Sequence, residues 1–149
     1  MNTVLLLGGA LALVSLAPPA YKTYHNARFG YRIDYPTDLR PQPEADNGDG
    51  RRFVSADGQT VLTAYASYNA LDGGLATDRR IAQQSWREKH ATLTLDQLTR
   101  TGYALSGRLG SRIFYEKTVL KAGTLTTFAW EYPVARKAAM VAAAGGASS

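Results

Sequence analysis

The chain has 149 residues, with 17 Lys or Arg and 12 Asp or Glu, and carries a net charge of +5. An apolar fraction of 45% is enough to fill a hydrophobic core, which argues against wholesale disorder. The sequence contains no cysteine, which excludes a disulfide framework, a thiolate metal site and a catalytic cysteine.

Residues 1–20 are uncharged and form an apolar leader. The apolar run 4–16 has the length of the hydrophobic part of a signal peptide and is shorter than the ~20 residues that span a bilayer. Cleavage after Ala20 is expected and would export the domain to the periplasm or the medium. An uncleaved anchor is the alternative, because no Lys or Arg precedes the run whereas Lys22 follows it.

The first elements of the domain are a strand and a long loop. Residues 31–35 alternate between apolar and charged side chains and end at Pro36, which predicts a short strand. The segment 36–50 contains three prolines together with Gly, Asn and Asp, and this composition predicts a surface loop.

Two β-rich runs follow, at residues 53–56 and 60–69. The Asp-Gly pair at 57–58 between them is a strong signal for a hairpin turn. A turn centred there places Phe53 opposite Leu62 on the neighbouring strand. Both faces of this hairpin carry apolar residues, so we expect the sheet to be covered on both sides.

The next segment predicts a helix that begins at Thr77 or Asp78 and ends near His90. Its apolar positions include Ile81 and Trp86, which share one face at helical spacing. We expect Trp86 to be the residue that anchors this helix to the sheet.

Four β-type runs follow the helix and are separated by short turns that contain glycine, which makes them antiparallel neighbours. An Ala-rich stretch at 134–144 then predicts a terminal helix, before a polar tail. The predicted fold class is α+β, with an antiparallel β-sheet flanked by helices, in one domain over residues 21–149 with a weakly ordered C-terminal tail. The four runs are residues 93–99, 103–106, 112–121 and 124–132.

The residues of the common catalytic and cofactor motifs are missing. His25 and His90 lie far apart and neither has a carboxylate at ligand spacing, and the sequence contains no P-loop, dinucleotide, serine-hydrolase or zincin motif. The acidic turn 46–50 does not fit a calcium loop, because the required ligand positions fall on Ala45 and Ala56. We therefore predict no catalytic residue, no metal and no cofactor.

The basic residues suggest a partner surface and no nucleic-acid footprint, because they occur as scattered pairs without interleaved aromatic residues. An envelope protein or an anionic surface is the expected partner, with membrane contact only through the leader. A turn at 122–123 would place Tyr115 opposite Trp130 on the last hairpin. The candidate partner-binding residues are Arg51, Arg52, Tyr115 and Lys117.

Three stretches carry a family resemblance: RFGYRIDYPTDLRPQPEADNGDGRRFVSADGQTVLTAY, YALSGRLGSRIFYEK and WEYP. Across residues 28–133 the chain resembles small exported bacterial proteins of the PsbP-like and DcrB-like α/β/α sandwich group. The resemblance implies an accessory or binding role, often in the envelope, with no common catalytic residues. The terminal helix departs from the group, because its only large apolar anchors are Val134, Met140 and Val141.

Three functional hypotheses follow from these observations. The first is a non-enzymatic periplasmic or secreted accessory or binding protein. The second is an immunity protein against a toxin delivered to the periplasm, a task that suits a small exported domain without motifs. The third is a hydrolase with a carboxylate pair, for which Asp57 and Glu116 are the candidates.

Overall fold

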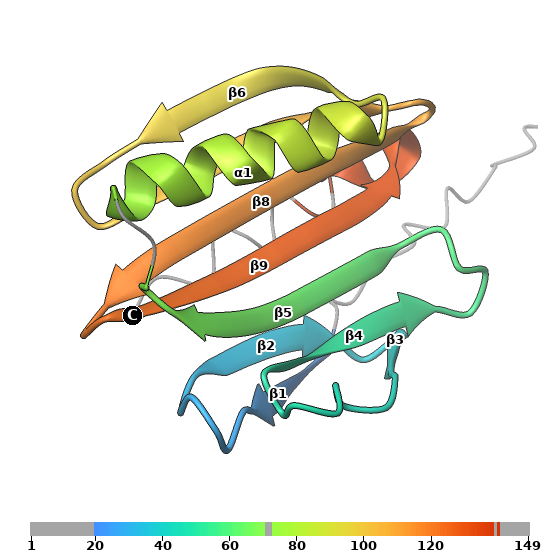
Figure 1. The fold of residues 1–149 in the computed structure, drawn as a ribbon. Coiled ribbons are helices and arrows are strands. Elements are labelled where there is room, and N and C mark those ends of the chain that lie inside the picture. The colour runs from blue at the N-terminus through green and yellow to red at the C-terminus, as the bar shows by residue number, and fades with distance from the viewer. Residues whose placement is uncertain (1–19, 71–72, 139, 141–149) are drawn as a thin grey trace, which may run out of the picture.

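A computed structural model describes residues 20–70, 73–138 and 140. It contains a seven-stranded antiparallel sheet, in the order β3-β4-β5-β9-β8-β7-β6, and a separate β1–β2 hairpin (Figure 1). The strands are β1 (Tyr21–His25), β2 (Arg32–Pro36), β3 (Leu39–Pro41), β4 (Gly50–Ser55), β5 (Val61–Tyr68), β6 (Thr92–Leu98), β7 (Gly102–Leu109), β8 (Arg112–Lys121) and β9 (Thr124–Pro133), and the helix is α1 (Gly74–Glu88).

The hairpin registers predicted from the turns are confirmed. Phe53 pairs with Leu62 across β4 and β5, and Tyr115 pairs with Trp130 across β8 and β9. The β8–β9 turn has positive φ at both Ala122 and Gly123, which is the geometry that matches the twist of two-residue hairpins. Pairing of β5 with β9 then joins the first half of the chain to the final meander.

Two strands were absent from the sequence prediction. β1 precedes the predicted strand at 31–35, which corresponds to β2, and pairs with it. β3 lies inside segment 36–50, which we had predicted to be a loop throughout, and pairs only with β4. It is a three-residue edge strand that ends in Pro41, a position where a missing N–H is tolerated, and its Leu39 is only 2% exposed.

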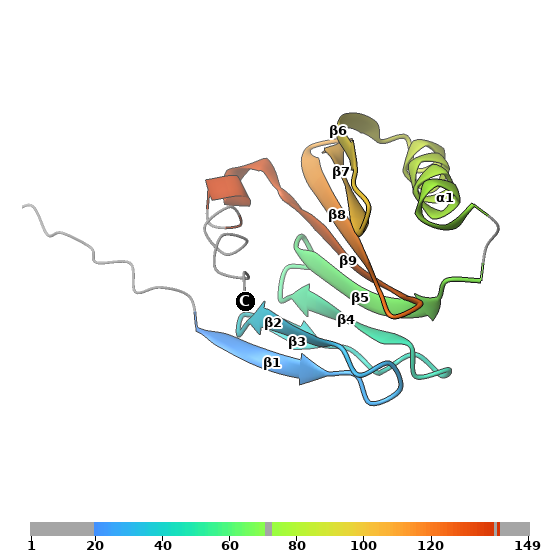
Figure 2. The same cartoon turned by 90° about the vertical axis from the view of Figure 1, so that its left-hand side faces the viewer.

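Helix α1 covers one face of the sheet over β6, β7 and β8 (Figures 1 and 2). It begins at Gly74, earlier than predicted, after Gly73 in a left-handed conformation. Trp86 is 3% exposed and stacks on Phe114 of β8 with ring centroids 4.0 Å apart. The prediction that Trp86 anchors this helix is therefore confirmed.

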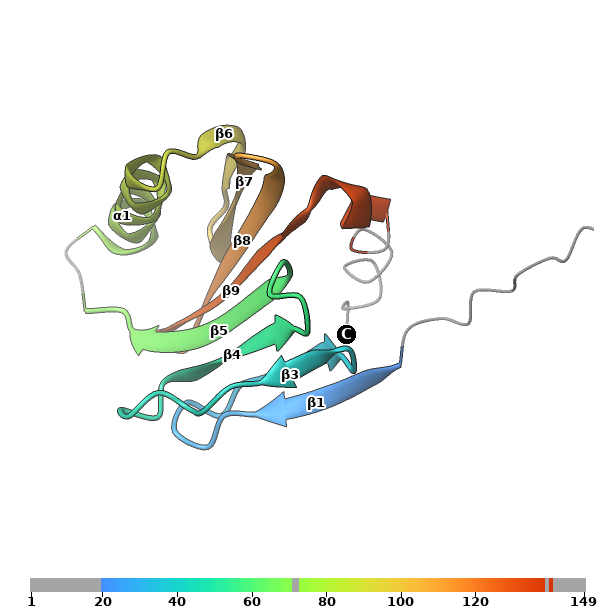
Figure 3. The ribbon, with the colours of Figure 1, turned by 90° about the vertical axis from the view of Figure 1, so that its right-hand side faces the viewer.

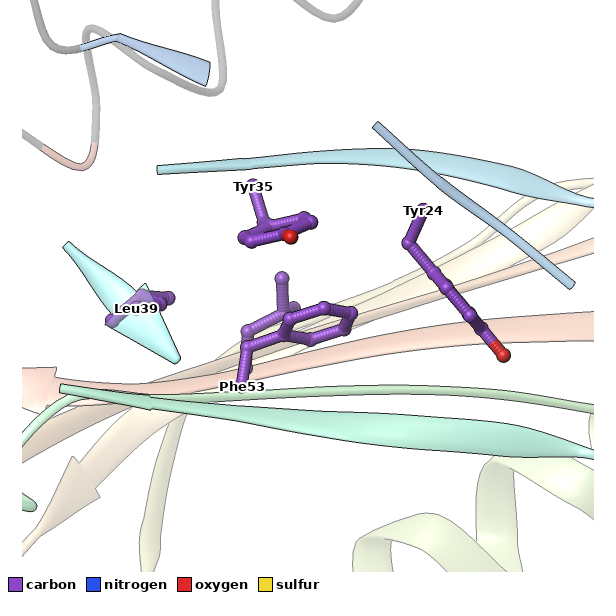
Figure 4. Packing of buried hydrophobic residues seen from close by; sticks show 5 residues of the cluster. Tyr24, Tyr35, Leu39 and Phe53 are labelled. Atoms are coloured by element: carbon purple, nitrogen blue, oxygen red, sulfur yellow. The ribbon is translucent and has the colours of Figure 1, made fainter. Parts of the chain in front are cut away.

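The opposite face is covered by the β1–β2 hairpin, which lies across the sheet from α1 (Figures 2 and 3). Tyr24 and Tyr35 point from the hairpin toward Phe53 of β4, and Leu39 of β3 packs beside them (Figure 4). The centroid of the Phe53 ring lies 4.2 Å from that of Tyr35 and 5.6 Å from that of Tyr24. Helices were predicted to flank the sheet, but among the described residues this second cover is a hairpin.

After β9 the chain forms a 3-10 turn, Val134–Arg136. Arg136 donates to Asp38 at 2.6 Å, and Met140 is buried against Ile113 and Tyr132. The predicted helix at 134–144 is described only up to 138 and at 140, where the residues after the turn are helical.

The leader and the C-terminal tail lie outside the described residues. No helix within the described ranges is long and apolar enough to cross a membrane.

An ion pair ties the exposed side of α1 to the edge strand β6. Arg79 of α1 donates two hydrogen bonds to Asp96 of β6, at 2.6 and 2.7 Å, and Gln83 donates a third. The guanidinium of Arg79 holds the pKa of Asp96 below its usual value of 3.8. The carboxylate therefore stabilises the folded state when ionised, and this contribution disappears as the pH falls through the lowered pKa.

Phe53→Ala is expected to lower the free energy of unfolding by about 3–5 kcal/mol, because it opens a cavity where the hairpin meets the sheet. Ile81→Ala is the matched control, since Ile81 is 52% exposed, and should change stability by about 0.5 kcal/mol or less. Urea unfolding measures both. Similar losses in the two variants would contradict this description of the core.

Asp96→Asn is expected to cost about 0.5–1 kcal/mol at neutral pH, as is typical of a well-aligned exposed ion pair. The difference from wild type should shrink as the pH falls from about 4 through the lowered pKa of folded Asp96, because the carboxyl group then becomes protonated first in the unfolded and then in the folded state. Urea unfolding across this pH range tests the prediction, and a difference that does not vary with pH would contradict it.

Candidate functional site

A groove of about 240 Å³ lies between α1 and the part of the sheet that the helix leaves uncovered. Because α1 sits over β6 to β8, the same face of β5 and β9 remains open beside it. The walls combine hydroxyl groups with apolar side chains. They include Ile81 and Ser85 from α1, Tyr65 and Ser67 from β5, and Thr127 from β9.

A buried carboxyl group forms part of the groove floor. Glu116 of β8 is 5% exposed, and its Oε2 accepts a hydrogen bond of 2.7 Å from the indole Nε1 of Trp86. Its Oε1 lies 3.3 Å from the hydroxyl oxygen of Tyr103 on β7, and that hydroxyl donates to Asp78 of α1 at 2.8 Å. These four residues, which we call the Glu116 network, connect α1 to two strands.

The alternation of side chains along β8 explains why the carboxyl group of Glu116 points into the core beneath α1. Side chains of a strand point alternately to its two faces, so Glu116 shares the face of Phe114 and Thr118, which are both fully buried. Thr118 forms a hydroxyl–hydroxyl bond of 2.7 Å with Thr127 on β9. Polar groups therefore continue from the network to the open side of the groove.

Burial sets the electrostatics of the network. Removal from water raises the pKa of Glu116, and the nearby Asp78 adds to the increase, whereas the hydrogen bond from Trp86 and the contact with Tyr103 oppose it. Burial also raises the pKa of Tyr103 strongly. On β5, desolvation and then the charge of Glu116 raise the pKa of Tyr65 to about 12. These tyrosines therefore remain neutral and offer hydroxyl groups for hydrogen bonding.

Glu116 is not placed to act as a general acid on a ligand in the groove. A general acid must reach its substrate, but both oxygens of Glu116 face side chains of the protein and the residue is almost completely buried. Within the described ranges, no three His, Cys, Asp or Glu residues are grouped to hold a metal ion. The hydroxyl groups on the walls can donate to and accept from a polar partner.

Arg51 and Arg52, predicted to bind a partner, lie on opposite faces of β4. The guanidinium of Arg51 lies 5.3 Å from the centre of the Tyr24 ring, and 3.9 Å separates it from a Glu44 oxygen, so it helps to hold the β1–β2 hairpin. Arg52 is exposed on the groove side of the sheet, where it pairs with Thr63 of β5.

Tyr115 and Lys117, also predicted to bind a partner, lie on β8 and point away from the groove. Tyr115 is half-buried opposite Trp130, and Lys117 is exposed opposite Phe128. β5 and β9 separate β8 from β4. The structure therefore brings Tyr115 and Lys117 together but does not join them to the two arginines in one patch.

The carboxylate pair considered for a hydrolase is not assembled. Asp57 lies in the exposed β4–β5 turn, where it accepts hydrogen bonds from Ser55 and Gln59. Glu116 lies under α1 and faces Asp78 through Tyr103. A signal for the burial of Glu116 was present in the sequence, because it shares the strand face of Phe114 on β8.

The chain matches no family model and no curated protein. Among solved structures it is similar to the solution structure of cyanobacterial PsbP (CyanoP) from Synechocystis sp. PCC 6803, with a TM-score of 0.60 and 18% sequence identity. The alignment covers 91% of this chain and 92% of that chain. The PsbP-like fold predicted from residues 28–133 is confirmed, while the DcrB-like resemblance and export remain predictions.

Proposed function

We propose that this chain is a non-enzymatic accessory protein that binds a partner through the groove between α1 and strands β5 and β9. One observation carries the proposal: the groove is open, lined by hydroxyl groups, and has as its floor a carboxyl group already engaged by the protein itself. A surface of this kind can accept a side chain or short segment of a partner without performing chemistry on it.

The placement of Glu116 supports binding. A carboxyl group held by Trp86 and Tyr103 keeps the distance between helix and sheet constant, and so maintains a preformed shape. The PsbP-like fold and the sequence resemblance also support a non-enzymatic accessory or binding role. We place the protein in the periplasm or outside the cell on the strength of the leader at residues 1–20.

The charges of the chain support an anionic partner, such as an envelope protein with an acidic surface. Arg52 is exposed on the groove side of the sheet, and Lys89 contributes to the groove with its ammonium 4.5 Å from the centre of the Trp86 ring. The lining also includes the carboxyl groups of Asp78, Glu116 and Glu131, so the attraction comes from the chain as a whole and not from the groove lining. The net charge of +5 adds a long-range attraction that raises the rate of encounter at low salt.

Two tryptophan substitutions distinguish the groove from the Tyr115–Lys117 surface. Ser67→Trp fills the groove from an exposed position on β5, whereas Lys117→Trp adds the same bulk to the opposite face of the sheet. We expect wild type and Lys117→Trp to recover a stoichiometric partner from envelope extracts, and Ser67→Trp to lose at least about 90% of it, a tenfold weakening.

Circular dichroism and thermal unfolding show whether both variants remain folded. Loss of the partner in Lys117→Trp alone would indicate that the binding surface lies on the other face of the sheet. Recovery of no stoichiometric partner by wild type would contradict the proposed function itself.

A further inference from the structure

In the Glu116 network, two carboxyl groups face one phenol hydroxyl group, which has only one proton to donate. The hydroxyl oxygen of Tyr103 lies 2.8 Å from Oδ2 of Asp78 and 3.3 Å from Oε1 of Glu116. A phenol carries one proton and can donate it to only one of these two groups. If both carboxyl groups were ionised, one of them would face a phenol oxygen with no proton between them.

The shorter contact, from Tyr103 to Asp78, is the better position for the phenol proton. With this proton donated to Asp78, the phenol oxygen of Tyr103 can accept a hydrogen bond from a protonated Oε1 of Glu116. The other oxygen of Glu116 is engaged by the indole of Trp86. A proton on Oε1 would complete a chain from Glu116 through Tyr103 to Asp78, with every member satisfied.

Solvent exposure decides which carboxyl group holds the extra proton. Asp78 is partly exposed at the surface of α1, where water stabilises its charge, whereas Glu116 is 5% exposed. Burial of an ionised carboxylate without a paired cation is costly, and such a group takes up a proton instead. The raised pKa of Glu116 agrees with this assignment.

The charged and titratable groups around Glu116 come from each packed element. Helix α1 contributes Asp78, and Lys89 directly follows the helix. β7 contributes Tyr103, β5 contributes Tyr65 and β9 contributes Glu131. Lys89 is the cation among them and favours ionisation, but its effect on the pKa of Glu116 is the smallest of the named causes, and burial is the largest.

We propose that Glu116 is a neutral carboxylic acid at neutral pH and that its proton completes a latch that holds α1 against the sheet. Loss of the proton leaves two negative carboxylates competing for one phenol proton and weakens the docking of α1. Because α1 forms a wall of the groove, the shape of the groove then depends on pH. This inference does not depend on what the groove binds.

The protonation state is tested directly by carbon-detected NMR of the side-chain carboxyl groups. Glu116→Gln assigns the Glu116 signal by its disappearance. We expect this signal to titrate clearly above the usual glutamate pKa of 4.5, and the Trp86 indole N–H signal to shift with the same midpoint. A midpoint below pH 7 would overturn the proposal, because Glu116 would then be ionised at neutral pH.

Asp78→Asn provides a second test, because it would not change the titration midpoint of Glu116 if the network had only a structural role. Removing the charge of Asp78 removes one cause that favours the proton on Glu116, so the midpoint of Glu116 should fall. Glu88→Gln is the matched control, because Glu88 is an exposed carboxylate on the same helix that bonds Gln84. An unchanged midpoint in Asp78→Asn, or an equal fall in Glu88→Gln, would overturn the proposed chain.

Stability across the pH range tests the latch. A raised pKa means that folded Glu116 holds its proton where unfolded glutamate has lost it, so wild-type stability falls as the pH rises from 4.5 through the raised value. Glutamine can accept from Trp86 and donate to Tyr103, as the neutral acid does. We expect Glu116→Gln to match wild type at low pH and to unfold at higher urea than wild type above the titration midpoint. Lower stability of Glu116→Gln at every pH would overturn the latch.

Discussion

The hydrogen bond between the indole of Trp86 and the carboxyl group of Glu116 is the contact on which the functional face depends. Both groups are buried, and a buried polar group without a partner costs about 1–3 kcal/mol, so each constrains the position of the other. The contact fixes where α1 rests along β7 and β8. It therefore also decides which strands α1 leaves open, and the groove over β5 and β9 follows from it.

The two faces of the sheet are covered by different kinds of packing. On the hairpin side, Tyr35, Phe53 and Leu62 form a largely aromatic cluster that the β1–β2 hairpin closes. On the helix side, Trp86 and Phe114 stack beside a carboxyl group and several hydroxyl groups. The apolar face supplies packing energy, whereas the polar face supplies a shaped surface and a group whose charge depends on its surroundings.

Local signals predicted most of the sheet, because short turns determine both direction and register. The Asp-Gly pair at 57–58 predicted the pairing of Phe53 with Leu62, and the turn at 122–123 predicted the pairing of Tyr115 with Trp130. Strand β3 escaped prediction because three residues that end in proline carry too little pattern. Strand β2 of the hairpin cover was predicted, but β1 and the position of the hairpin over the sheet were not, because an apolar sheet face requires a cover without specifying which segment supplies it.

The candidate site was harder to predict than the fold. Tyr103 lies 25 residues from Asp78 and 13 from Glu116, and nothing in their spacing indicates that they meet. Their proximity depends on the register of β7 with β8 and on how α1 docks. The predicted partner residues were chosen by residue type and by the pairing expected in the last hairpin, and the fold then placed Arg51 and Arg52 on opposite faces of the same strand.

The most direct test of this account is hydrogen exchange at the indole Nε1 of Trp86, followed by NMR on the intact protein. If the indole is buried and bonded to Glu116 as described, its proton should exchange at least about a hundredfold more slowly than that of a free tryptophan. Exchange at the rate of a free indole would contradict the account, because α1 would then not be docked on the sheet and the groove beside it would have no fixed shape.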